Sequence, residues 1–188
     1  MAKISGEAFD KKNAARKRDK EIENLVIELH SSEEVIVLDA IEKTRELGDA
    51  KMIPALVGLL VDKENPENVT SAVRKLLNQL KTPDVLPYLF DTLEDPKTEG
   101  FRNQIVASIW ESGLNPHEYL DQLISLAIDE DYLTCLEVLT VVENFVDLPS
   151  EDSLQENLQR INSALPFAQE QKELLESLSE VIQNLMMS

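Results

Sequence analysis

The segment KTPDVLPYLF, at residues 81–90, indicates how this chain folds, because a proline directly follows a residue that can cap a helix. Asp, Asn and Thr side chains accept hydrogen bonds from the free N–H groups at a helix start. Proline suits the first helical position because it has no N–H to leave unpaired. Counting in steps of 33 residues through Thr82 gives Asp49, Thr82, Asn115 and Leu148, of which the first three can cap a helix. The residues that directly follow them are Ala50, Pro83, Pro116 and Pro149. A fixed period of this length predicts stacked repeats of helices.

Apolar residues recur with the same period and define a first helix in each repeat. The columns are Ile36, Val69, Arg102 and Cys135; Ala40, Val73, Val106 and Leu139; Lys43, Leu76, Ile109 and Val142; and Leu47, Leu80, Gly113 and Val146. Columns spaced by four, three and four residues share one face of a helix. The pattern therefore predicts first helices at about 34–47, 67–81, 99–113 and 132–146.

A second helix of each repeat begins at the proline position. Its columns are Ile53, Leu86 and Tyr119; Val57, Phe90 and Leu123; and Leu60, Leu93 and Leu126. These columns predict helices at about 50–62, 83–94 and 116–129. In the fourth repeat the apolar positions move to Leu154, Leu158, Ile161 and Leu165, which predicts a short insertion near Pro149 and a helix at 151–165.

The two ends of the chain differ from the repeats. Residues 7–30 have the pattern of one amphipathic helix with Leu25, Val26 and Leu29 on its inner face. Residues 167–186 predict a last helix with an apolar stripe of Leu174, Leu178, Val181 and Leu185. A stack of repeats needs such caps, because an uncovered terminal repeat would expose its apolar side. We therefore expect one all-α domain over residues 1–188, in which 7–30 and 167–186 cap the repeats at 34–165. Residues 1–6 and the last two or three are expected to be loose.

One part of the repeat carries a family resemblance. Leu93-Glu94-Asp95-Pro96 is followed by Phe101-Arg102 and by Trp110-Glu111-Ser112-Gly113, and the segment Ile41–Gly48 matches in part. These residues resemble the HEAT-repeat family of α-solenoids. The resemblance implies a right-handed α-α superhelix of about four HEAT-like hairpins, with the second helices lining its concave side. Because Val69 and Cys135 share the column of Arg102, the stacked Asp–Arg ladder common in that family is doubtful here.

The charge of the chain limits the classes of partner. The formal net charge is −18, and residues 103–188 carry two basic against 16 acidic side chains. A surface this acidic repels phosphate backbones, so we expect no nucleic-acid binding by the body of the protein. The charge has two interpretations: it keeps the protein soluble, or it forms an acidic face that attracts a basic partner. No apolar run is long enough to insert into a membrane.

Catalytic and cofactor signals are weak. The single cysteine, Cys135, lies in an apolar run, which is typical of a small buried residue. His30 and His117 have no metal-ligand spacing, and we expect neither a cofactor nor a metal. Since the N-terminal residues lack the apolar core of a secretory signal, we expect a cytoplasmic protein, unless a signal has been removed. The alternative, an enzyme or accessory protein of the HEAT-like type that handles a bilin or a modified base, is not favoured by the lone cysteine or by the absence of a basic groove.

The resemblance places a candidate protein-binding surface on the polar positions of the second helices. These positions are Asp84, Tyr88, Asp91, Asp95, His117, Asp121, Gln122, Ser125 and Asp129. Tyr88 is an aromatic residue among acids, and aromatic residues are common anchors for a partner. The sequence therefore favours a non-enzymatic scaffold or adaptor that binds a basic protein or peptide. It leaves the oligomeric state open.

A basic run near the N-terminus contrasts with the acidic chain. It consists of Lys11, Lys12, Arg16, Lys17, Arg18 and Lys20. One interpretation is a flexible arm for an acidic membrane or partner. We favour the other, in which this helix packs over the acidic repeats of its own or a neighbouring chain. Leu25, Val26 and Leu29 would anchor it over the first repeat, and its cations would reach acids that include Glu33, Glu34 and Glu42.

Overall fold

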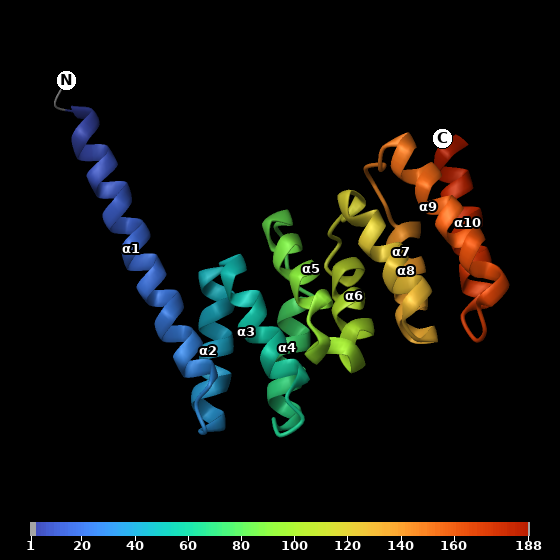
Figure 1. The fold of residues 1–188 in the computed structure, drawn as a ribbon. Coiled ribbons are helices and arrows are strands. Elements are labelled where there is room, and N and C mark those ends of the chain that lie inside the picture. The colour runs from blue at the N-terminus through green and yellow to red at the C-terminus, as the bar shows by residue number, and fades with distance from the viewer. Residues whose placement is uncertain (1–2, 188) are drawn as a thin grey trace. The chain divides into compact units, whose positions relative to one another are not determined.

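The fold is described by a computed structural model that covers residues 3–187, with side chains for residues 12–187. Every secondary-structure element in this range is helical (Figure 1). Of the residues expected to be loose, 1, 2 and 188 lie outside the described part, whereas residues 3–6, 186 and 187 are helical. None of the helices in the described range combines the length and the apolar character that crossing a membrane requires.

The helices follow one another through short connections. The first half of the chain contains α1 (Lys3–Leu29), α2 (Glu34–Leu47), the 3₁₀ turn η1 (Ala50–Met52), α3 (Ile53–Val61), α4 (Glu67–Leu77), η2 (Pro83–Val85) and α5 (Leu86–Glu94). The second half contains η3 (Pro96–Phe101), α6 (Arg102–Glu111), η4 (His117–Tyr119), α7 (Leu120–Asp129), α8 (Tyr132–Glu143), α9 (Glu151–Ala164), η5 (Leu165–Phe167) and α10 (Lys172–Met187). The chain divides into two compact units, Met1–Val73 and Arg74–Ser188, with the boundary inside α4.

In the first unit, α1 packs along α2 and also contacts α3. Its buried side chains are Ile22, Leu25 and Leu29, at spacings of three and four residues that place them on one face. They meet a buried face of α2 that includes Val37 and Ile41. The expected packing of the N-terminal helix over the first repeat is thus confirmed for its C-terminal half.

In the second unit the helices form two layers. The first layer contains α6, α8 and α10, because α8 packs against both of the others. The second layer contains α7 and α9, which pack against each other, while α7 also covers α8 and α9 also covers α10. Gly113 ends α6 in a left-handed conformation with φ of 74°. The N–H of Leu114 then donates to the carbonyl of Ile109, which is the Schellman pattern.

The second helices begin with a 3₁₀ turn that the sequence pattern did not predict. The N–H of Ile53 donates to Ala50, and the N–H of Leu86 donates to Pro83, so each first turn is tightened. The next residue is Pro54 or Pro87, which has no N–H to continue the α-helical ladder. α7 also follows a 3₁₀ turn, η4, but has Leu120 at this position, so proline accompanies the change from 3₁₀ to α-helix in two of the three second helices.

Several predicted positions shift in the structure. α8 ends at Glu143, so Val146 is exposed instead of closing the last column, and α4 ends at Leu77 instead of 81. The buried stripe of α10 is Leu175, Leu178 and Ile182, one residue later than predicted at two of its positions. The columns of Ala40 and Val57 are buried as predicted. α9 occupies Glu151–Ala164, which agrees with the helix predicted at 151–165.

Candidate functional site

The second helices of the second unit carry an exposed row of acidic side chains. Asp84 and Asp91 are exposed on η2 and α5, and Glu118 and Asp129 are exposed on η4 and α7. None of the four forms an ion pair with any side chain that the structure describes. We call Asp84, Asp91, Glu118 and Asp129 the acidic strip.

The ring of Tyr119 joins the two helical segments that carry two of these acids, Asp91 and Glu118. This ring stacks on Phe90 of α5, with ring centroids 4.1 Å apart and an angle of 12° between the planes. Burial raises the pKa of the Tyr119 phenol above 10, and the charges of Glu118 and Asp91 raise this pKa further. Carboxylates from two successive hairpins therefore act on the same phenol.

Glu118 was missed in the sequence analysis. It precedes Gln122 by four residues, so the two lie on neighbouring turns of one helix face, and both are exposed. This spacing, applied to the exposed positions of the 116–129 helix, would have found it.

Asp121 and Ser125 have a different role from the one predicted, because both side chains hold α9. Asp121 Oδ1 accepts from Asn157 Nδ2 at 2.5 Å, and Asn157 is completely buried. Ser125 Oγ accepts from the guanidinium of Arg160 at 2.6 Å, and the same guanidinium donates to the Asp121 carbonyl at 3.0 Å. A buried amide must keep its hydrogen bonds, so these contacts stabilise the packing of α7 on α9.

The other predicted residues lie in varied surroundings. Asp95 is exposed, and its carboxylate caps η3 by accepting from the N–H of Lys97 at 2.9 Å. Tyr88 and His117 are half-buried, and Gln122 is exposed. The Nδ1 atom of His117 is buried with no hydrogen-bond partner among the described atoms.

Of the nine predicted binding residues, four are exposed and have no described contact that occupies their side chains. They are Asp84, Asp91, Gln122 and Asp129.

A groove of about 590 Å³ lies beside Asp129, between α7 and α9. Asp129 and Glu156 contribute carboxylates to its lining, while Gln159, Arg160 and Ser163 add polar atoms. The guanidinium of Arg160 is already bonded to Ser125 and Asn157. The open hydrogen-bonding capacity of this groove is therefore mostly that of acceptors.

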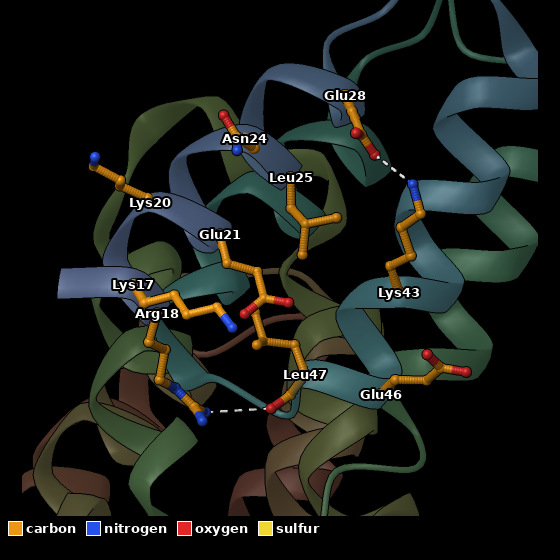
Figure 2. Close-up of a pocket in the computed structure, with 10 residues that line it drawn as sticks. All are labelled: Lys17, Arg18, Lys20, Glu21, Asn24, Leu25, Glu28, Lys43, Glu46 and Leu47. Carbon is orange, nitrogen blue, oxygen red and sulfur yellow. Dashed lines mark hydrogen bonds and ion pairs between the residues drawn. The ribbon is translucent and has the colours of Figure 1, made fainter. Parts of the chain in front are cut away.

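The first unit contains a separate cleft of about 700 Å³ between α1 and α2 (Figure 2). Two of its charged side chains, Lys43 and Glu28, pair with each other across the cleft, and Arg18 bonds to the α2 end of it. Lys43 Nζ lies 3.0 Å from Glu28 and 2.8 Å from Asp39, and Arg18 donates to the carbonyl of Leu47 at 3.2 Å. These contacts fasten α1 to the hairpin beneath it, so we assign the cleft a structural role.

Cys135 is fully buried in α8, and burial raises the pKa of its thiol to about 11. A thiol with such a pKa is almost entirely protonated near neutral pH and is a poor nucleophile. Among the described residues no group of three or more His, Cys, Asp or Glu side chains is arranged to hold a metal ion.

Comparison with known protein families, with curated proteins and with solved structures finds no match to this chain.

Proposed function

We propose that this chain is a non-enzymatic protein-binding module whose acidic strip engages a basic protein or peptide. The proposed architecture is a right-handed α-solenoid of about four HEAT-like hairpins with helical caps. The 33-residue period and the two layers of the second unit support this architecture. The strip would then lie on the concave side, which is the usual binding surface of a solenoid.

The observation that carries the proposal is the stack of Phe90 on Tyr119, because the residues next to these rings in the sequence are the exposed acids Asp91 and Glu118. Neither carboxylate is paired with a described cation. Unpaired carboxylates on neighbouring helical segments attract a cation that can approach both. A lysine or arginine of a partner would supply that cation.

The surroundings of the strip favour the same partner chemistry. Residues 74–188 contain seven basic and 21 acidic side chains, so the second unit attracts cations from a distance. The stacked rings of Phe90 and Tyr119 hold the backbone beneath the two acids in a fixed position. A fixed row of charges provides complementarity with little ordering cost on binding.

The test is binding of a fluorescent lysine-rich peptide, measured by fluorescence anisotropy at low and at high salt. One variant reverses the strip with Asp84→Lys, Asp91→Lys and Asp129→Lys. A control variant makes the same change in net charge on α8 and α10, in the other layer, with Glu143→Lys, Glu173→Lys and Glu180→Lys. All three control residues are exposed.

We expect the strip variant to lose most of the binding and the control variant to keep most of it. Salt should weaken the binding to the wild type, because ions screen exposed charges within about 10 Å at ordinary ionic strength. Equal losses in the two variants would show that only the net charge matters, and the proposed site would then be wrong. Circular dichroism checks that both variants keep their helix content.

A further inference from the structure

The N-terminal half of α1 has no partner in the part of the chain that the structure describes. Among the side chains of α1 that the structure describes, the most N-terminal buried one is Ile22, and every side chain from residue 12 to 21 is exposed. At about 1.5 Å per residue, the 27 residues of α1 span roughly 40 Å, about twice the length of the 14-residue α2. The helix therefore extends well beyond α2 (Figure 1).

Four cations on this extension have no ion pair with any described side chain. They are Lys12, Arg16, Lys17 and Lys20. Two charged residues between them are paired instead: Arg18 pairs with Asp49 at 2.6 Å, and Asp19 pairs with Lys51 at 2.9 Å. We call Lys12, Arg16, Lys17 and Lys20 the basic arm. It is a helical row of positive charge in a chain of net charge −18.

The composition of the arm argues against two classes of acidic partner. A helix that lies on a membrane needs a large apolar face, and the apolar side chains from residue 12 to 21 are only Ala14 and Ala15. Nucleic acid would meet four free cations here but would be repelled by the 21 acidic side chains of the second unit. An acidic patch on a protein needs no apolar face in the arm, and because it has a lower charge density than a phosphate backbone, the acidic side chains of the second unit oppose its approach less.

We propose that the basic arm of one copy docks on the acidic strip of a second copy of this chain. The arm offers four unpaired cations over nine residues, about 13 Å of helix, and the strip offers four unpaired carboxylates. The proposal rests on the function proposed for the strip and names its basic partner. Since each copy carries one arm and one strip, the contact is head-to-tail, and it can close into a ring or extend further.

The experiment is a charge swap measured by sedimentation velocity at low salt over a range of concentrations. The arm variant carries Lys12→Glu, Arg16→Glu, Lys17→Glu and Lys20→Glu. The quadruple strip variant adds Glu118→Lys to the three strip changes described above, Asp84→Lys, Asp91→Lys and Asp129→Lys. All eight side chains are exposed, and circular dichroism confirms that each variant keeps its helix content.

The wild type should associate as its concentration rises, and each variant alone should associate at least about tenfold more weakly, since four exposed ion pairs are lost. An equal mixture of the two variants should associate again, because the acidic arm of one matches the basic strip of the other. Reversal of the three control carboxylates on α8 and α10 should change association by much less than tenfold.

A wild type that stays monomeric, or a mixture that fails to recover association, would overturn the proposal. If the monomeric wild type still binds the lysine-rich peptide through the strip, this inference fails and the proposed function stands. If association survives reversal of the strip but not of the arm, the strip is not the partner of the arm. Arm-dependent binding to anionic vesicles or to duplex DNA, without self-association, would also overturn the proposal.

Discussion

Asp49 makes two kinds of contact through one carboxylate. Its Oδ1 atom accepts from the N–H of Lys51 at 3.1 Å and so caps η1, while Oδ2 accepts from Arg18 of α1 at 2.6 Å. Burial acts to raise the pKa of Asp49, but the hydrogen bonds from Arg18 and Lys51 and their positive charges outweigh it and lower the pKa. The position was recognisable from the sequence as a helix cap, whereas the ion pair was not.

Two substitutions at Asp49 separate these contacts. Asp49→Asn keeps a good capping side chain and removes the charge, so it should destabilise the protein less than Asp49→Ala, for which loss of the cap alone costs about 0.5–2 kcal/mol. The pKa of Asp49 is lower in the folded protein than in the unfolded chain. The negative charge of Asp49 therefore stabilises the fold fully at pH values above the pKa of the unfolded chain. This stabilisation is lost as the pH falls through the pKa of the folded protein. The difference between the wild type and Asp49→Asn should therefore be present at pH 7 and disappear well below pH 3.8, the ordinary value for this group. Urea titrations at both pH values measure it, and a difference that persists in acid would contradict the assignment.

Exposure of the candidate site residues was predictable only where the repeat is regular. Asp84 and Asp91 lie off the apolar columns of a regular hairpin and are exposed, as the pattern indicates. Asp121 and Ser125 follow the same pattern, but Asn157 and Arg160 bind them from the fourth repeat. The insertion near Pro149 breaks the period there, so no column of the sequence places α9 against these two residues.

At the scale of elements, the period predicted which segments are helical better than where each helix ends. The predicted first helix at 34–47 matches α2, where Gly48 stops the helix with φ of 59°. No such glycine follows α8, and that helix ends at Glu143, three residues before the predicted end. The predicted ion pairs of the N-terminal helix with Glu33, Glu34 and Glu42 are wrong. Glu42 pairs with Arg45 of its own helix, and Glu34 accepts a hydrogen bond from Asn68.

The uneven packing of α1 predicts different effects for two truncations. Removing residues 1–20 deletes the exposed side chains of residues 12–20 and the ion pairs of Arg18 and Asp19, but it leaves Ile22, Leu25 and Leu29 in place. Removing residues 1–29 deletes these three side chains as well, and each is worth about 1.5–3 kcal/mol when fully buried. The longer truncation should therefore lower the free energy of unfolding by several kcal/mol more than the shorter one, as measured by urea titration. If the two truncated chains unfold at the same urea concentration, α1 does not stabilise the first unit in this way.

At the scale of the whole molecule, most of the negative charge belongs to the second unit. Residues 74–188 have a net charge of −14, and residues 1–73, which include the basic arm, have a net charge of −4. Charge of one sign on a compact body destabilises it through self-repulsion. The described ion pairs are few and mostly exposed, and such pairs contribute little. Repulsion is therefore expected to dominate the electrostatic part of stability.

This balance predicts that added salt stabilises the chain at pH 7. The screening length falls from about 10 Å at 0.1 M to about 3 Å at 1 M, so Tm should rise with sodium chloride over this range. Replacing two exposed carboxylates, with Glu143→Gln at the C-terminal end of α8 and Glu180→Gln in α10, should raise Tm at low salt and reduce its salt dependence. Lys75→Gln, which removes an exposed cation, should do the opposite. Thermal melts followed by circular dichroism measure all three. A Tm that falls with salt in the wild type would mean that attractive ion pairs outweigh the repulsion.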